Sequence, residues 1–182
     1  MQSEKINPVD SCAVAVAQGA AQSETLAATG VYTVECFDAD GNLKWSDQIK
    51  NLVVTVGRND LLDKYFSGSA YTALWYLGLI NSGGTYSAGD TMASHATWTE
   101  NTGYAAATRP APTWNSASAG SKSTTATAFA INATGTIGGA FLTNNNVKGG
   151  TTGILYSAGN FTGGNRSVAS GDTLNVTYTA SV

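Results

Sequence analysis

Short runs of β-forming residues, separated at close intervals by turns rich in glycine and asparagine, limit what this sequence can fold into more than any other feature. Turn signals recur at 81–84, 87–90, 144–146, 148–150, 163–165 and 170–172, and β-rich runs lie at 123–132, 136–143, 153–157 and 173–179. This spacing is typical of antiparallel sandwiches and jelly rolls. We therefore expect an all-β fold, mainly an antiparallel β-sandwich or jelly-roll-like.

The last run alternates as a strand with one buried face should. Leu174, Val176 and Tyr178 fall on one side of it, and polar residues fall on the other.

A hairpin is predicted near the beginning of the β-rich part, where runs at 31–37 and 43–56 flank the turn at 38–42. Glycine and asparagine accept a positive φ, and aspartate bonds its own backbone, so Asp-Ala-Asp-Gly-Asn suits this turn. A calcium loop begins similarly, but it needs Gly at its sixth position and Glu at its twelfth. The chain has Leu43 and Ile49 there, which favours the hairpin.

One short helix is predicted near residues 60–67. Asn59 suits the N-cap, Asp60 and Asp63 suit the first turn, and Gly68 can end the helix. Four apolar residues share one side at helical spacing, namely Leu61, Leu62, Tyr65 and Phe66. Because so short a helix is unstable alone, we expect this side to pack on a sheet. The run at 72–80 is apolar on both faces and predicts a buried strand, in the core or partly under a neighbouring subunit.

Residues 1–30 differ from the rest, since they contain no aromatic side chain and consist largely of Ala, Gln, Ser and Val. We interpret them as an extended N-terminal arm that becomes ordered when a neighbour holds it, followed by a single β-rich domain over 31–182. The apolar run at 12–17 follows a stretch of negative net charge, whereas a signal peptide needs a basic one, so we expect no signal peptide.

Two cysteines, Cys12 and Cys36, are too few and too far apart for a disulfide framework. We expect free thiols in a reducing cytoplasm, with Cys36 as a small core residue.

The low content of charged residues limits the functional classes to which this chain can belong. Charged residues make up 12% of the chain, against about 25% in a typical soluble domain. Residues 101–182 contain a single acid, Asp172, and uncharged threonine-rich surfaces suit β-structure that packs on other protein. The net charge of −3 argues against a nucleic-acid partner, and the absence of a long apolar run argues against a membrane partner.

Catalytic patterns are missing from the sequence. His95 is its single histidine and is expected in a surface or hydrogen-bonded loop, and neither a GxSxG nor a P-loop pattern occurs. We expect no enzyme activity, no metal site and no cofactor. A carboxylate pair of the glycosidase kind stays open, although it would have to come mainly from the first half of the chain.

Aromatic residues concentrate between positions 75 and 114, where Arg109-Pro-Ala-Pro-Thr-Trp114 is also expected to be extended and stiff. Aromatics of this kind serve in cores, in interfaces or as sugar platforms. The candidate interface residues are Trp75, Tyr76, Trp98, Arg109, Pro110, Pro112 and Trp114.

The runs at 51–63, 75–80, 90–95, 98–100, 109–114, 138–141 and 170–174 resemble small structural proteins of tailed bacteriophages. The resemblance covers about residues 31–182 and carries over no active-site residue. It implies a virion protein made in the bacterial host cytoplasm, most simply a capsid decoration (cement) protein on the capsid surface. Its partners would be the major capsid protein, whose capsomers it would bridge and stabilise, and further copies of itself. A tail or head-fibre component with a carbohydrate-binding β-sandwich is the alternative.

Overall fold

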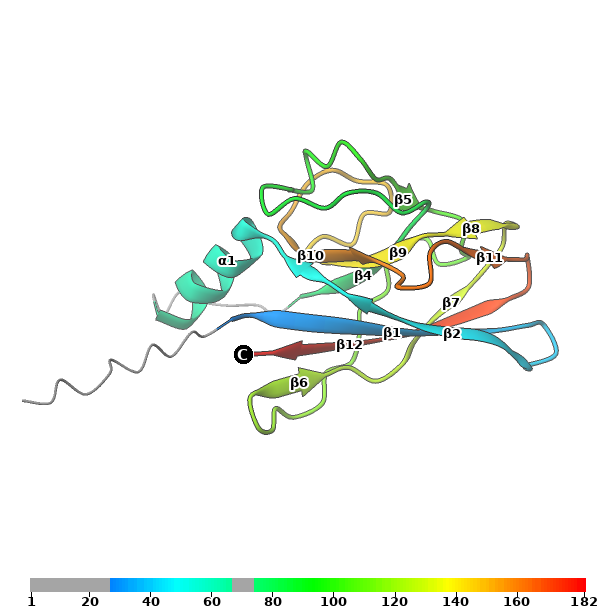
Figure 1. Ribbon diagram of the computed structural model, residues 1–182, viewed down its shortest axis with the longest axis horizontal. Coiled ribbons are helices and arrows are strands. Elements are labelled where there is room, and N and C mark those ends of the chain that lie inside the picture. Colours follow the sequence, from blue (N-terminus) through cyan, green and yellow to red (C-terminus); the bar gives the residue numbers. More distant parts are fainter. Residues whose placement is uncertain (1–26, 67–73) are drawn as a thin grey trace, which may run out of the picture.

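A computed structural model of the chain describes residues 27–66 and 74–182. Two antiparallel sheets of five strands each lie face to face, and a two-stranded ribbon stands beside them (Figure 1). The predicted all-β sandwich is thereby confirmed. The arm predicted over residues 1–30 lies outside the described residues except for its last four positions, of which Thr29 and Gly30 already belong to the first strand.

The first sheet is built around the pairing of its first and last strands in sequence. It contains β1 (Thr29–Phe37), β2 (Leu43–Lys50), β6 (Ser121–Ser123), β7 (Thr127–Ala130) and β12 (Thr173–Ser181). The strand β1 pairs with β12 along its whole length, from Thr29 opposite Ser181 to Phe37 opposite Thr173. The strands β2, β6 and β7 complete the sheet on either side of this pair.

The second sheet has the order β3-β10-β9-β4-β5. Its strands are β3 (Leu52–Val53), β4 (Tyr76–Ile80), β5 (Glu100–Asn101), β9 (Gly139–Thr143) and β10 (Leu155–Asn160). The ribbon consists of β8 (Gly135–Ile137) and β11 (Arg166–Val168). The sequence predicted one strand at 136–143, and the structure divides it at Gly138, whose N–H donates to the Ile80 carbonyl.

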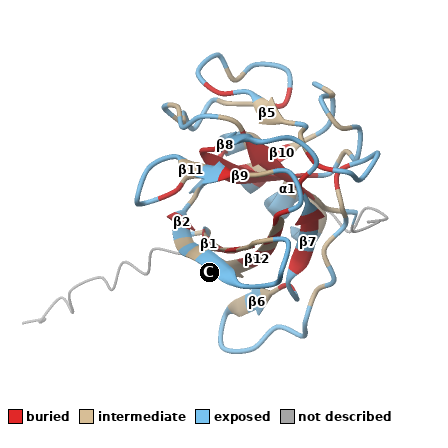
Figure 2. Ribbon diagram, turned by 90° about the vertical axis from the view of Figure 1, so that its right-hand side faces the viewer, coloured by how far each residue is buried: buried red, intermediate tan, exposed pale blue. Residues whose placement is uncertain are grey.

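The core lies between the facing sides of the two sheets (Figure 2). Buried residues alternate along β1 and β12, and every residue of β9 is buried. Leu174, Val176 and Tyr178 are fully buried, which confirms the alternation read from the sequence. The described part of the predicted buried strand is β4, whose last four residues are buried, whereas positions 72 and 73 lie outside the described residues. A hydrogen bond of 2.7 Å between the hydroxyls of Tyr32 and Ser157 joins the two sheets.

The hairpin between β1 and β2 is confirmed in detail. Oδ1 of Asp38 accepts hydrogen bonds from the N–H groups of Asp40 at 3.0 Å and Asn42 at 2.8 Å. Gly41 has a φ of 84°, the left-handed conformation that the sequence assigned to this turn.

Close to this hairpin, the buried Asp172 contacts the buried thiol of Cys36 and the exposed lysine Lys44. Its Oδ2 accepts hydrogen bonds from the Lys44 ammonium at 2.5 Å and from the Ala169 N–H at 2.7 Å, and lies 3.7 Å from Sγ of Cys36. Burial alone would raise the pKa of the Asp172 carboxyl, but these donors outweigh burial and lower it. Burial raises the pKa of Cys36 to about 11, so this thiol is neutral. Cys36 is fully buried, as predicted, and Cys12 lies outside the described residues.

We expect the Asp172→Asn variant to lose less stability in acid than the parent chain. An unfolded aspartate titrates near pH 3.9. Because the folded-state pKa is lower, the stabilisation is complete above the unfolded pKa and is lost as the pH falls through the folded one. Urea unfolding at pH 7 and between pH 5 and pH 2 measures this difference. The variant at the exposed Asp63, Asp63→Asn, is the control, and parallel curves for parent and Asp172→Asn would contradict the prediction.

The helix α1 spans Thr55–Phe66, five residues earlier than predicted, and Asn59 lies inside it rather than at its N-cap. The earlier start follows from tertiary contact: Gly57 lies against the backbone of Tyr156, where a Cβ would come within 2.5 Å of the Tyr156 carbonyl oxygen. The expectation that the apolar side of the helix packs on a sheet is wrong, since all four of its residues are exposed: Leu61, Leu62, Tyr65 and Phe66. In the described residues, no helix is both long enough and apolar enough to cross a membrane.

Candidate functional site

An apolar pocket of about 560 Å³ lies between α1 and the neighbouring end of the sandwich. Its described lining residues are Asp60, Leu61, Lys64, Tyr65, Trp75, Trp114, Lys122, Leu142, Tyr156, Tyr178 and Ala180. A concave site with mainly aromatic and aliphatic walls and few polar groups is typical of a binding site.

Five aromatic side chains line the pocket, and each comes from a different segment: Tyr65, Trp75, Trp114, Tyr156 and Tyr178. Trp75 precedes β4 and meets Tyr156 of β10 with ring centroids 5.4 Å apart and planes at 67°. Trp114, from the segment between β5 and β6, meets Tyr178 of β12 at 6.1 Å and 86°. Edge-to-face contacts of this kind are a favoured arrangement of aromatic rings, and they hold the two tryptophans against the sheets.

Behind these rings, Tyr178 is held by polar groups of the core. Its hydroxyl accepts a hydrogen bond from Nδ2 of Asn51 at 3.2 Å and lies 3.5 Å from the Ser157 hydroxyl. Burial raises the pKa of Tyr178 above its usual value, so the hydroxyl is neutral. Gly30 is required beside it, because a Cβ at this position would come within 2.8 Å of the Tyr178 ring.

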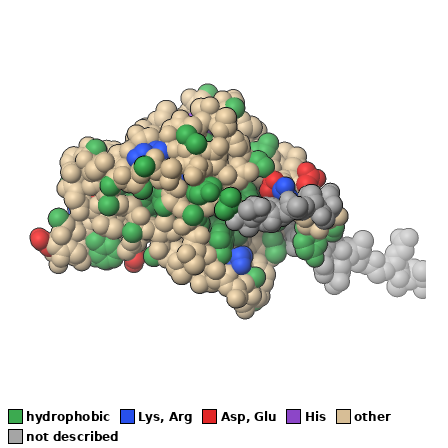
Figure 3. Space-filling view, turned by 180° about the vertical axis from the view of Figure 1, so that it is seen from behind, with side chains coloured by type: hydrophobic (Ala, Val, Ile, Leu, Met, Phe, Trp, Pro, Cys, Tyr) green, Lys and Arg blue, Asp and Glu red, His purple; other side chains and the backbone are tan. Residues whose placement is uncertain are grey.

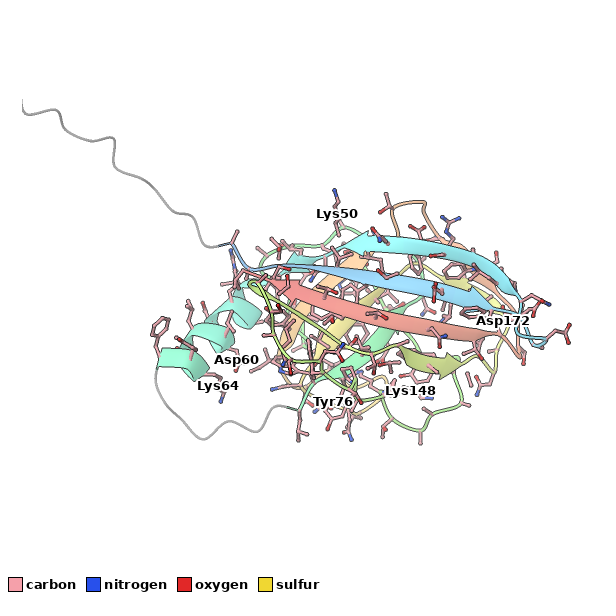
Figure 4. The ribbon with its side chains drawn as sticks, turned by 90° about the horizontal axis from the view of Figure 1, so that it is seen from below. Lys50, Asp60, Lys64, Tyr76, Lys148 and Asp172 are labelled. Atoms are coloured by element: carbon pink, nitrogen blue, oxygen red, sulfur yellow. The ribbon has the colours of Figure 1, made fainter. Side chains whose placement is uncertain are left out.

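Three charged side chains also line the pocket, and we refer to the part that they form as its rim. Asp60 and Lys64 belong to α1, labelled in Figure 4, and Lys122 belongs to β6 and donates to the Asn115 carbonyl at 2.8 Å. Seen from behind in Figure 3, hydrophobic side chains gather across the middle of the molecule, and charged ones are sparse. Such walls suit the binding of an apolar or flat group. Within residues 27–66 and 74–182, no three His, Cys, Asp or Glu side chains come together as a metal site would require.

The structure brings only two of the predicted interface residues together at this pocket, Trp75 and Trp114. Tyr76, Pro110 and Pro112 are partly exposed elsewhere, and the Pro110 carbonyl accepts a hydrogen bond from the N–H of Leu77 in β4. The stiff segment at 109–114 therefore begins beside β4 of the second sheet, and its other end, Trp114, bridges to Thr124 and packs on Tyr178 of the first sheet.

Trp98 and Arg109 correct the interface prediction, because they are 3% and 1% exposed and present no surface to a partner. The Trp98 ring is covered by His95, whose ring stacks on it with centroids 3.9 Å apart. Nδ1 of His95 also lies 2.9 Å from the Trp98 carbonyl oxygen, so the histidine is a hydrogen-bonded loop residue, as expected. Arg109 is buried because Glu100 neutralises it.

Sequence reasoning missed Tyr156 and Tyr178 as pocket residues. The alternation over 173–179 places Tyr178 on the buried face. The alternation does not show that Tyr178 also borders a pocket. The pocket exists because of where α1 and the segment containing Trp114 lie relative to this end of β12.

Comparison with protein-family models, with curated proteins and with solved structures finds no match to this chain. The fold class and the pocket therefore stand on the chain's own geometry.

Proposed function

We propose that this chain is a structural protein of a tailed-bacteriophage virion, and specifically a capsid decoration protein that bridges capsomers of the major capsid protein. The resemblance of its sequence runs to phage structural proteins supports this proposal, as do the low charge and the sandwich fold. A decoration protein acts by adding buried contact between neighbouring capsid subunits. A standard contact buries about 1,600 Å² in total, and symmetry repeats it over the shell.

The observation that carries the proposal is the bare outer side of α1. Leu62 and Phe66 are 51% and 76% exposed and are not among the residues that line the pocket. The ring of Phe66 meets edge to face, at 4.9 Å, the ring of Tyr65, which is also exposed and borders the pocket. Adjacent exposed apolar side chains on one element are typical of a surface that another protein covers. The helix packs on the sandwich through Gly57, which lies against the backbone of Tyr156 in β10.

The aromatic pocket favours the second candidate, a fibre component that binds carbohydrate. Flat rings such as those of Trp75 and Trp114 stack on sugar faces, and both line the same cavity. This candidate requires the pocket, whereas the decoration proposal requires the outer side of the helix. Variants in the pocket and variants on the outer side of α1 therefore distinguish the fibre candidate from the decoration proposal.

The test adds purified protein to phage particles that lack it and measures co-sedimentation. We expect the double variant Leu62→Ser, Phe66→Ser to keep its thermal unfolding temperature, because both side chains are exposed, and to lose at least tenfold in particle binding. The control is Leu43→Ser, which changes an equally exposed leucine at the opposite end of β1 and β2.

Normal binding of the helix variant would contradict the decoration proposal. Two results together would favour the fibre candidate instead. The parent chain would bind to a glycan array and Trp114→Ala would not, and the helix variant would bind particles normally.

A further inference from the structure

We propose that the aromatic pocket binds the apolar run at 12–17 of a second copy of this chain, so that neighbouring copies are joined by their N-terminal segments. This inference concerns contacts between copies and does not depend on which protein covers the outer side of α1.

The first argument is position. The N-terminal end of β1 lies at the pocket, since Gly30 pairs with Ala180 and Tyr32 pairs with Tyr178, and both partners line the cavity. The helix, this end of β1 and the C-terminus all lie at the same end of the sandwich (Figure 1). The residues that precede Thr29 in the chain therefore start at the pocket's edge.

Strand direction favours a second copy over the same chain. From Thr29 the strand β1 runs along the sandwich to the hairpin at its far end. At Thr29 the strand direction, followed toward the N-terminus, points out of the sandwich, so binding in the chain's own pocket would require a reversal of the chain that binding in a second copy does not.

Side-chain chemistry is the second argument. The run Cys-Ala-Val-Ala-Val-Ala at 12–17 has small apolar side chains, and residues 1–26 contain no aromatic ring. The pocket supplies what the run lacks, with two tryptophans and three tyrosines in its walls. Burying apolar surface contributes about 25 cal/mol per Å², and this run would bring no charged side chain that must be desolvated.

Charge is the third argument. Residues 1–26 contain three acids, Glu4, Asp10 and Glu24, and one base, Lys5. The pocket rim has the opposite balance, with Lys64 and Lys122 against Asp60. Complementary charges of this kind orient a segment as it approaches its site.

The reach is sufficient. Eleven residues, 18–28, separate the run from β1, and an extended segment of that length spans up to about 36 Å. A compact domain of this size has a radius of gyration of about 15 Å, so the run can reach the pocket of a copy packed alongside.

Disulfide trapping in the full chain tests this inference, because Cys12 belongs to the run and Cys36 is buried. The variant Lys122→Cys places a thiol at the pocket rim. With oxidised glutathione as the oxidant, Cys12 and the new thiol lose two electrons and two protons to form the disulfide, and glutathione is reduced. We expect a reducible dimer on a non-reducing gel, with peptides containing residues 12 and 122 joined in the mass spectrum.

The control is Leu43→Cys, an exposed thiol at the opposite end of the sandwich, which should form at least tenfold less dimer under the same conditions. Adding Val14→Asp and Val16→Asp to the Lys122→Cys chain should remove the dimer, because a charge would then enter the apolar pocket. A bond within one chain, or dimer no more abundant than in the control, would overturn the proposal. Particle binding through α1 is read separately, so failure here and failure of the proposed function are distinguishable.

Discussion

Replacing Arg109 with alanine is expected to lower the free energy of unfolding by about 3–5 kcal/mol, because removing one partner of a buried ion pair leaves the other uncompensated. The guanidinium donates to both carboxylate oxygens of Glu100, at 2.9 and 2.8 Å, and to the carbonyls of Asn145 and Gly150, each at 2.8 Å. The N–H of Gly149 also donates a hydrogen bond to Oε2 of Glu100, at 2.6 Å. The pair thus joins β5 to the loop that connects β9 and β10.

Equilibrium unfolding in urea at pH 7 measures this loss. Arg58→Ala is the matched control, since Arg58 is exposed and its guanidinium donates to the Thr55 hydroxyl of its own helix. The effect of this variant should stay within about 0.5 kcal/mol. Arg109→Lys should remain strongly destabilising, because an ammonium cannot reproduce the paired geometry of the guanidinium. A loss below about 1 kcal/mol for Arg109→Ala would contradict this account.

Phe141→Ala is expected to cost a similar amount, about 3–5 kcal/mol, the usual cost of removing a buried phenylalanine. Phe141 is fully buried in β9 and lies between two sets of contacts. Its ring centroid is 5.3 Å from that of Trp98 and 5.2 Å from Cζ of Arg109. On β4 its neighbour is Gly78, which has to be glycine because a Cβ there would overlap the ring.

A double-mutant cycle gives this prediction a specific signature. In the parent chain, Gly78→Ala should destabilise by about 1–3 kcal/mol, because the new methyl overpacks the site. In the Phe141→Ala background the same methyl fills part of the cavity, so its cost should fall to near zero. Thermal unfolding of the four chains measures the coupling, and additive effects would show that Gly78 and Phe141 do not share this space.

Local patterns in the sequence predicted the sandwich and its turns, because these depend on residues close together in the chain. The hairpin at 38–42 and the buried face of β12 are of this kind, and both are confirmed. The start of α1 was wrong by five residues because Gly57 packs on Tyr156, about a hundred positions away.

The candidate site was predicted less well, because burial of a polar residue depends on its partner in space. Arg109 stands in a proline-rich, extended segment and was expected at the surface, yet Glu100 and two carbonyls make its burial possible. Trp75 and Trp114 were singled out from the sequence, but their convergence on Tyr156 and Tyr178 depends on two sheets and a helix meeting at one end. The spacing of residues in the sequence does not show that the two sheets and the helix come together at that end.

The pairing of β1 with β12 has a consequence for synthesis on the ribosome. The two strands pair from Thr29 opposite Ser181 to Phe37 opposite Thr173, so the centre of the first sheet joins residues about 150 positions apart. While β12 is still untranslated, β1 can pair only with β2, and its other edge has no partner. Such long-range pairing slows folding and leaves strand edges open meanwhile. The chain therefore completes its first sheet only after β12 has been translated.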